Sequence, residues 1–574
     1  MLQFVALAIL AVGDNASFPL GDPVLEPPTD RSLGVYWIIR GDDNRNARIA
    51  VDYRRTGSSE WKKGPPLFRV AKGPHRDREN GSKLTEQVPD DAWLFAGSVV
   101  LLDPGTSYEI RLKLSDPDGG SAEKLLTART IAEPTLAPGA PQLHVVPGEG
   151  GGTGAAGDPL KGLAAAEARA KPGDLVLVHA GVYPPFVVRK SGEPGKPIVW
   201  RGAGDGEALV GGADPGSKAI IAEGIHDAWF ERLVIRNKDF GLHAPEAARI
   251  VVRRCLFQKV KNGITCTRNA RGAVQGWWIS DNVLEGVSPW PRPGGKMDDN
   301  EWRGIQITGT GSVVCYNRVH HFKDAIDTFP SSACSAIDFH NNDVSELNDD
   351  GFEMDYSERN VRNFHNRIVN AFCGVSIQPV YGGPVYLFRN VLYNITNEPF
   401  KMHNSPSGVL ALHNTSVRKG MPIQLFTPLK VSNSVFRNNL FIGTGGPYAF
   451  ENNAPMVDCD FDYDGFGGGP WKIFLKWNDT RYSTIEEART KAPVYKHAVI
   501  VDPATLFASG VRVPEDALKA CDRSIDLRLK PGAAAIDAGE ILPGFNDGFA
   551  GKAPDLGAYE LGQEIPFYGP RPEK

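Results

Sequence analysis

The sequence predicts an all-β protein in which a β-sandwich precedes a right-handed parallel β-helix. Its 574 residues include 63 glycines and 44 prolines, and 41% are hydrophobic, which is typical of a globular chain rich in strands and turns. A hydrophobic-x-x-Asn pattern also recurs about every 24 residues, with one insertion after its first member. The repeated asparagines are Asn282, Asn317, Asn342, Asn366, Asn390, Asn414 and Asn438. Such a period predicts stacked coils whose asparagine amides bond along the stack.

Charge and cysteine content exclude some classes of protein. The formal net charge of −5 carries no basic stripe, so no nucleic-acid partner is expected. The seven cysteines have no CxxC spacing. Cys255, Cys315 and Cys373 lie in strand patterns, where a buried thiol is the simplest interpretation, although one or two disulfides would be compatible with the sequence.

The first residues predict export. Phe4 to Val12 form an apolar run that is too short to span a bilayer and resembles the core of a signal peptide within 1–17. A secreted protein, extracellular or periplasmic, is therefore expected; a buried first strand is the alternative. The rest of the chain contains no segment suited to crossing a membrane.

Residues 18–133 predict a separate sandwich domain. Val35 to Ile39 and Arg48 to Tyr53 alternate as strands do, with polar turns between them. The segment 101–110 (LLDPGTSYEI) resembles the strand entry of fibronectin type III domains. That resemblance implies a β-sandwich in which Tyr108 makes a corner hydrogen bond. No catalysis is expected in this domain.

Residues 134–456 predict the β-helix, and 457–574 its terminal coils and a C-terminal cap. An alanine-rich helix at about 160–170 is followed by Pro172-Gly173-Asp174 and then by SGEPGKPI at 191–198. This passage resembles the opening of bacterial β-helix proteins, including family 9 pectate lyases and chondroitinase B. The resemblance implies a capping helix and the first coils.

Aligning the coils predicts which side chains share a face, because successive residues of a strand point to opposite sides. The interior column is expected to hold Ile305, Ile326, Phe352, Val375, Phe400 and Ile423. The adjacent outer column is expected to hold Gln306, Asp327, Glu353, Ser376, Lys401 and Gln424. One outward step further along come Thr308, Asp355, Gln378 and His403.

This register gathers carboxylates, a lysine and a histidine on one outer face. Asp327 and Glu353 on adjacent coils would be roughly 5 Å apart, so either a cation lies between them or one pKa is raised. Oxygen ligands at this density suit Ca²⁺. Stacked like charges without partners destabilise a sheet, which favours a functional site over a solvated face.

Three short motifs in this region resemble family 9 polysaccharide lyases. They are Asp324-Ala325-Ile326, the stretch 348–353 (NDDGFE) and the stretch 398–402 (EPFKM). The resemblance implies a Ca²⁺ site formed by Asp324, Asp349, Asp350 and Glu353. It also implies that Lys401 is the catalytic base. The sequence departs from the family at Glu353, which replaces an aspartate, at Ala325, which replaces a glycine, and in an additional coil before Lys401.

The expected activity is Ca²⁺-dependent β-elimination of an extracellular uronate-containing polysaccharide by a monomeric enzyme. The catalytic candidates are Lys401, His403, Asp327 and Asp355. The candidates for substrate binding are Gln306, Gln378, Trp290 and Trp302, of which the tryptophans flank an insertion at 287–302. Two alternatives stay open: an inverting glycoside hydrolase that uses Asp327, Glu353 and Asp355, and a non-catalytic carbohydrate-binding or structural β-helix.

Overall fold

A computed structural model describes residues 15–76, 81, 83–85, 87–266, 274–295, 299–329, 334–425, 427 and 429–573. The chain forms two compact units, one comprising residues up to 131 together with 543–545, and the other comprising 132–542 and 546 onward. The apolar run at 4–12 lies outside the described residues, so the signal peptide stays a prediction. Among the described residues, no helix is long and apolar enough to cross a membrane.

The N-terminal unit consists of two antiparallel sheets. One contains β1 (Phe18–Pro19), β2 (Val24–Leu25), β3 (Leu33–Arg40), β6 (Phe68–Lys72) and β7 (Ala92–Val99). The other contains β4 (Arg48–Arg55), β5 (Lys62–Lys63), β8 (Ser107–Ser115) and β9 (Ser121–Arg129). Val35 and Trp37 of the first sheet share one buried cluster with Val51 and Ile110 of the second, as in a sandwich. The Tyr108 hydroxyl accepts a hydrogen bond from Asp103 N at 3.0 Å and donates to Asp103 Oδ2 at 3.1 Å.

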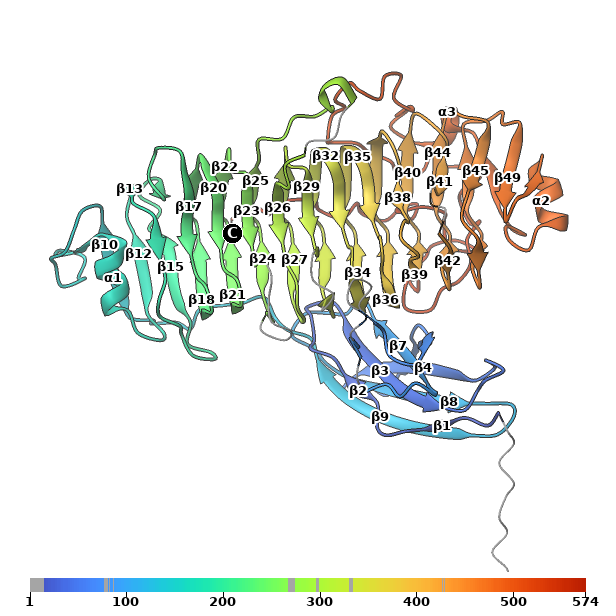
Figure 1. Cartoon of the computed structure of the whole chain (residues 1–574), viewed down its shortest axis with the longest axis horizontal. Coiled ribbons are helices and arrows are strands. Elements are labelled where there is room, and N and C mark those ends of the chain that lie inside the picture. The colour runs from blue at the N-terminus through green and yellow to red at the C-terminus, as the bar shows by residue number, and fades with distance from the viewer. Residues whose placement is uncertain are drawn as a thin grey trace, which may run out of the picture. The chain divides into compact units, whose positions relative to one another are not determined.

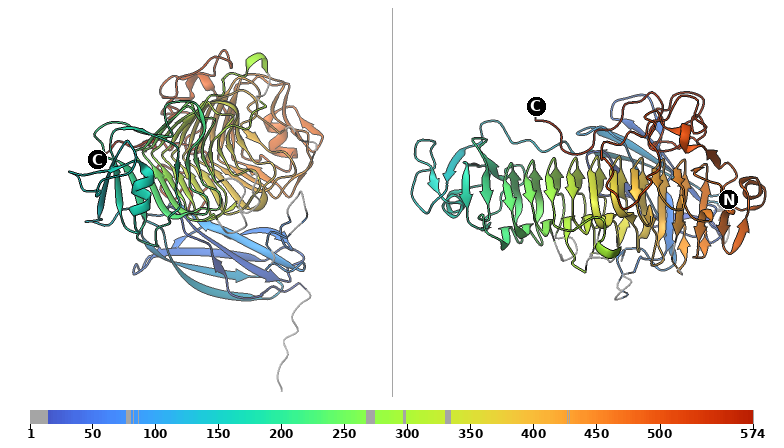
Figure 2. Two further views of the ribbon diagram at one scale, coloured as in Figure 1. Left: turned by 60° about the vertical axis from the view of Figure 1, so that its left-hand side comes forward. Right: turned by 90° about the horizontal axis from the view of Figure 1, so that it is seen from above.

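The second unit is a parallel β-helix, which confirms the predicted fold class. Its described strands form two long parallel sheets and shorter ones. The first long sheet runs from β10 (Gln142–Val146) and β12 (Leu175–Val178) through β24 (Trp278–Ser280) and β34 (Val361–Phe364) to β46 (Met456–Val457). The second runs from β13 (Gly181–Tyr183) to β51 (Val499–Val501). The coils stack along one axis behind the short helix α1 (Leu163–Arg169), which packs at their start (Figures 1 and 2).

The second long sheet supplies the strands around the acidic face. In chain order they are β26 (Arg303–Gln306), β28 (Arg318–His320), β29 (Asp324–Asp327), β32 (Asp343–Glu353), β35 (Arg367–Ser376), β37 (Val391–Ile395) and β38 (Phe400–Lys401). Pairing matches Gln306 with Asp327, Asp327 with Glu353, Glu353 with Ser376, and Ser376 with Lys401. The predicted register is therefore confirmed over these five coils. Ile326, Phe352 and Phe400 of the neighbouring column are buried in the interior.

An asparagine ladder runs inside the coils, as the repeat predicts, but its end is different. Asn317 N and Nδ2 both donate to Asn342 Oδ1, at 3.0 and 3.1 Å. The same two bonds recur at each later rung, formed by Asn366, Asn390, Asn414, Asn439 and Asp464. The prediction that Asn438 belongs to the ladder is wrong. Its backbone is left-handed (φ 59°) and its side-chain amide donates to Glu540 O at 2.8 Å. The coil is one residue longer here than the preceding repeat.

Small residues occupy one column on the strands of the acidic face. Gly304, Ala325, Gly351 and Gly374 follow one another up the coils, and a Cβ on Gly351 would lie 2.7 Å from Ile368 Cγ2. Larger side chains therefore cannot occupy this column. Residues on both sides of the column, such as Asp324 and Glu353, line the same pocket. Side chains on these strands therefore do not alternate strictly between the interior and the outer face.

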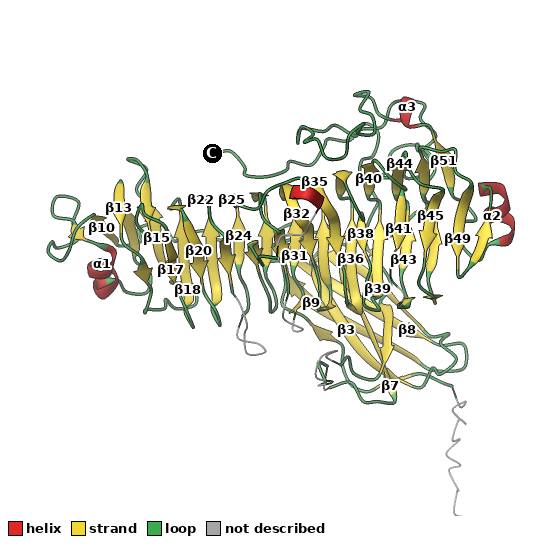
Figure 3. Ribbon diagram, turned by 45° about the horizontal axis from the view of Figure 1, so that its top comes forward, coloured by secondary structure: helices red, strands yellow, loops and turns green. Residues whose placement is uncertain are grey.

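The last part of the chain continues the coils and then runs back along them. After β48 (Gly465–Gly467), β49 (Ile473–Trp477), helix α2 (Ile485–Lys491) and helix α3 (Pro503–Leu506), most of the tail is loop (Figure 3). Residues 457–574 were expected to form terminal coils and a C-terminal cap that closes the stack. Instead, Ala558 N donates to Thr415 Oγ1 at 2.8 Å and Arg571 Nη2 contacts Asp281 Oδ2 at 2.6 Å, both far from the last coil. The tail therefore covers the side of the β-helix.

Candidate active site

A pocket of about 460 Å³ opens on the outer face of the coils from β26 to β38. Its lining combines acids, bases, two phenylalanines and two carboxamides. The residues are Glu301, Arg303, Lys323, Asp324, Phe329, Asp349, Glu353, Phe372, Cys373, Gln378, Asn397, Glu398, Lys401 and His403. Six of the twelve expected site residues therefore line one pocket, although they lie on different coils.

Arg303 organises the first half of the pocket. Its guanidinium forms an ion pair with the fully buried Asp327, and its Nη2 lies 3.7 Å from Glu353 Oε2 and 2.6 Å from Glu301 Oε2. Burial disfavours the charged guanidinium, but the charges of Asp327 and Asp324 outweigh it and raise the pKa of Arg303. Arg303 is thus a fixed cation among several carboxylates.

Lys401 organises the second half. Its Nζ lies 2.9 Å from Asp350 Oδ2 and 3.7 Å from Asp349 Oδ2. Burial alone would lower the pKa of Lys401, but the charges of Asp350 and Asp349 raise it above its ordinary value. The structure therefore holds Lys401 as an ammonium ion.

Arg292 binds the outer edge of this acidic group. Its Nη2 donates to Asp349 Oδ1 at 2.9 Å, its Nε donates to Asn348 O at 2.5 Å, and its guanidinium lies 3.2 Å from the centre of the Phe372 ring. Arg292 comes from the insertion that the sequence predicts beside this face. The insertion therefore supplies a cation to the site.

The buried carboxyl groups compete for protons. Burial, followed by the charge of Asp349, raises the pKa of Asp324 to about 7. Burial raises the pKa of Asp327 to about 6 against the opposing effect of Arg303. Burial and neighbouring acids raise the pKa of Asp350 and of Glu353 well above their ordinary values. The cluster is therefore poised to exchange protons or to share a cation near neutral pH.

Two carboxylate oxygens of this cluster lack an internal partner. Asp324 Oδ1 accepts from Asp350 N at 3.1 Å, but Asp324 Oδ2 and Asp350 Oδ1 are buried with no hydrogen bond from any described residue. A buried carboxylate oxygen without a donor is costly, so a cation would be favoured here. Carboxylate oxygens are the hard ligands that Ca²⁺ prefers.

Cys373 marks a limit of this fit. Ligand atoms of Asp349, Asp350 and Cys373 lie within 4.8 Å of one another, and Asp324 and Glu353 are outside that close group of described residues. Burial raises the pKa of the Cys373 thiol well above its ordinary value, so the thiol stays neutral and is a poor ligand for Ca²⁺. The oxygens of the close group therefore come from Asp349 and Asp350 alone.

His403 and Gln378 line the pocket, as their predicted column requires. His403 Nε2 lies 3.1 Å from Glu398 Oε2, a buried carboxylate. Phe329 and Phe372 add apolar surface of the kind on which sugar rings stack. The pocket thus combines charged, polar and aromatic side chains.

Several expected site residues serve the fold instead. The buried amide of Gln306 donates to Phe329 O at 2.7 Å, so it is occupied in holding the strand end. Asp355 lies beyond the end of β32 and is buried; its Oδ1 accepts from Ser376 Oγ and Gln378 N, both at 2.8 Å. These contacts correct the expectation that Asp355 projects into the site, because the chain turns after Glu353.

The tryptophans of the insertion are also not where they were expected. Trp290 and Trp302 are partly buried and are not among the described residues that line the pocket. Trp302 packs near Lys261, whose Nζ lies 5.8 Å from its ring centre. The aromatic surface comes from Phe329 and Phe372, which sequence reasoning missed.

Sequence reasoning also missed Arg303, Lys323 and Glu398. Arg303 directly precedes the aligned coil Gly304 to Gln306, and pairing places it opposite Asp324. A basic residue one coil from an aspartate was a usable signal. It was overlooked because strict alternation places position 303 on the inner side of the strand.

These observations define the class: a right-handed parallel β-helix protein with a buried acidic pocket on its outer face. Residues 213–392 match the family model described as "Right handed beta helix region". No curated protein matches the chain in sequence.

Solved structures with similar folds are distant. A GH136 lacto-N-biosidase from Eubacterium ramulus is 14% identical with a TM-score of 0.34, and the match covers 56% of this chain and 64% of that one. A family 28 exopolygalacturonase from Yersinia enterocolitica is 10% identical with a TM-score of 0.25, covering 76% and 98%. The catalytic domain of a GH87 alpha-1,3-glucanase, in complex with nigerose, is 10% identical with a TM-score of 0.28, covering 80% and 90%. At these values the similarities carry no information about the activity of this chain.

Proposed function

We propose that the pocket cleaves a uronate-containing polysaccharide by Ca²⁺-dependent β-elimination. The observation that carries the proposal is the contact of Lys401 with Asp350 and Asp349, beside buried carboxylate oxygens that lack an internal donor. This contact supports the proposal of a base and a cation site that lie close together. Bound Ca²⁺ would neutralise the uronate carboxylate and stabilise the charge that develops on it as the C5 proton leaves.

Lys401 is proposed to accept the C5 proton at Nζ. The C5–H and C4–O bonds break and a C4=C5 double bond forms, so the leaving oxygen needs a proton. His403, which lines the pocket beside Glu398, is the proposed donor of that proton. Lys401 can act as a base only when neutral, which requires its contact with Asp350 to weaken. The Ca²⁺ requirement follows from that condition.

An inverting glycoside hydrolase is the second candidate, favoured by the unequal environments of two carboxyl groups. Asp327 is paired with Arg303, which favours its ionised form. Burial and the charge of Asp327 raise the pKa of Glu353 well above its ordinary value. Glu353 as acid and Asp327 as base would divide the roles that hydrolysis needs.

One assay distinguishes these reactions. The full chain, stripped with EDTA, is incubated with a panel of uronate polysaccharides and neutral glucans, with and without added Ca²⁺. Elimination predicts ultraviolet absorbance from unsaturated ends together with new reducing ends, both only with Ca²⁺. Reducing ends without absorbance would support the hydrolase, and binding without cleavage would contradict both enzymes and support a carbohydrate-binding protein.

The proposal also includes where the enzyme acts and its oligomeric state. A polysaccharide substrate is normally met outside the cytoplasm, which agrees with the predicted signal peptide. Action as a secreted monomer stays a prediction. The elution volume of the exported chain in gel filtration would test it.

A further inference from the structure

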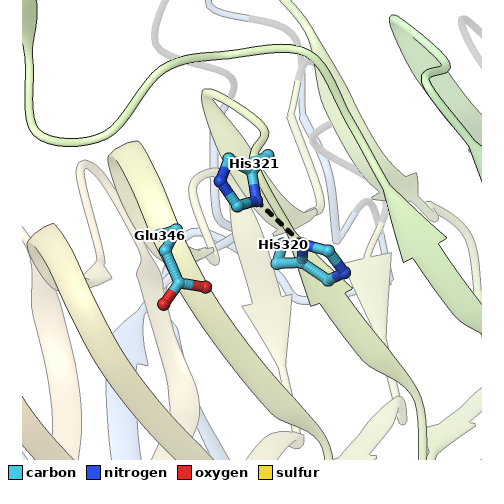
Figure 4. A group of neighbouring side chains, drawn as sticks. All are labelled: His320, His321 and Glu346. Atoms are coloured by element: carbon cyan, nitrogen blue, oxygen red, sulfur yellow. Dashed lines mark hydrogen bonds between the residues drawn. The ribbon is translucent and has the colours of Figure 1, made fainter. Parts of the chain in front are cut away.

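A second cluster of metal-ligand side chains lies outside the pocket, on two neighbouring coils. His320 ends β28, His321 follows it, and Glu346 lies in β32 of the next coil. Ligand atoms of the three residues lie within 4.8 Å of one another, and all three residues are partly exposed. Figure 4 shows the two imidazoles in contact, with Glu346 beside them.

The contact between the two imidazoles leaves a ring nitrogen available. Nδ1 of His320 lies 2.8 Å from Nδ1 of His321, so at least one of these nitrogens carries a lone pair rather than a proton. A ring nitrogen with a lone pair is the form in which histidine coordinates a metal ion.

Glu346 is held in place by its neighbours. Its Oε1 accepts from Asn370 Nδ2 at 3.1 Å, and its Oε2 accepts from the Ser345 hydroxyl. Asn370 is fixed in turn, because its Oδ1 accepts from Cys521 N at 3.0 Å and from Asn394 Nδ2 at 2.8 Å. Such outer hydrogen bonds orient a ligating carboxylate and are typical of metal sites.

The backbone holds His321 and Glu346 at the same turn of neighbouring coils. His321, Glu346, Asn370 and Asn394 follow one another at the same turn of successive coils, with φ of 60°, 52°, 59° and 58°. Asparagine tolerates this left-handed conformation better than glutamate does. The glutamate therefore gives the backbone no advantage over asparagine at this turn.

We propose that His320, His321 and Glu346 bind one Zn²⁺ or a similar first-row transition ion, with water completing the coordination. Two imidazoles and one carboxylate suit Zn²⁺ and not Ca²⁺, which prefers an all-oxygen set. The site is therefore chemically distinct from the acidic pocket. The turn that it holds leads through Lys323, which lines the pocket, into β29. The ion would stabilise this turn without taking part in the chemical step.

The test is a metal titration of the full chain. Protein stripped with EDTA is first given excess Ca²⁺ to occupy oxygen sites and is then titrated with Zn²⁺ by calorimetry, or with Co²⁺ by visible absorption. One equivalent should bind, and Zn²⁺ should raise the midpoint of thermal unfolding. His321→Asn introduces asparagine, the residue that Asn370 and Asn394 provide at the same turn of later coils. Glu346→Gln keeps an oxygen that can accept a hydrogen bond from Asn370. Each variant should weaken binding at least about tenfold and remove most of the thermal shift.

A matched control is His497→Asn. His497 contacts Asp462 at 2.8 Å and stacks on Tyr463, away from the cluster, so this variant should bind as the wild type does. Circular dichroism verifies that each variant is folded. The proposal is overturned if the wild type binds no stoichiometric Zn²⁺ or Co²⁺, or if Glu346→Gln and His321→Asn leave the affinity unchanged.

Discussion

Lys401 Nζ lies 2.9 Å from Asp350 Oδ2, although 51 residues separate them in the sequence. Stacking brings them together: Glu353, Ser376 and Lys401 pair across successive coils, and Asp350 lies three residues before Glu353 in β32. The contact fixes the protonation of the amine in the absence of another cation. The first prediction follows from it.

Replacing Lys401 with Ala should abolish turnover, because a general base contributes roughly 10²–10⁴-fold to the rate. Lys401→Arg should not restore activity, since a guanidinium does not lose its proton. The measurement is the initial rate of formation of unsaturated ends on the best substrate of the panel. Lys476→Ala is the control, because Lys476 is a buried lysine on a later coil that donates to Asn453 Oδ1 at 2.9 Å. Full activity in Lys401→Ala would remove the proposed base.

Asp350→Asn should raise the Ca²⁺ concentration needed for activity by at least about tenfold, because a carboxamide is a weaker ligand than a carboxylate. The measurement is the rate as a function of free Ca²⁺ after EDTA treatment. Asp355→Asn is the matched control: its Oδ1 can still accept from Ser376 and Gln378, so its Ca²⁺ dependence should be unchanged. An equal change in both variants would argue against a Ca²⁺ ligand role for Asp350.

Arg303→Met should lower the free energy of unfolding by about 3–5 kcal/mol, because it leaves the buried Asp327 without its partner. Adding Asp327→Asn should recover much of the loss, since the unpaired charge is then removed. Urea-induced unfolding measures both changes. Arg528→Met, at an exposed pair with Asp526, should have no measurable effect. A double variant no more stable than Arg303→Met would show that the guanidinium acts mainly through packing.

Stability should fall as pH rises from about 4 to about 7, in part because of Asp464. Burial raises the pKa of Asp464 to about 7 from 3.8, against the opposing hydrogen bonds from Asn439. The folded state therefore binds a proton that the unfolded state has released, and its stabilising effect is complete below the unfolded pKa and lost as pH passes the folded one.

Asp464→Asn should flatten that pH dependence. The amide oxygen can still accept both bonds from Asn439, and no charge is buried at high pH. At pH 8 the variant should gain up to about 4 kcal/mol over the wild type, the value of a three-unit shift. Thermal unfolding from pH 4 to 8 measures the difference. A variant less stable than the wild type at pH 8 would contradict the argument.

The sequence alone determined the period of the coils, the interior column and the outer column that carries Asp327, Glu353 and Lys401. These features depend on alternation within short strands and on a repeat of nearly constant length, both of which are local. The capping helix and the sandwich sheets were likewise predictable from local patterns.

Only the tertiary structure decided the directions of side chains at bends and turns. Asp324 and Glu353 both line the pocket although strict alternation separates them, Asp355 after the end of β32 is buried, and one added residue shifts the ladder from Asn438 to Asn439. The partner Arg303 was hidden for the same reason. Contacts between coils depend on how distant segments pack in three dimensions. The sequence of any one segment does not determine that packing.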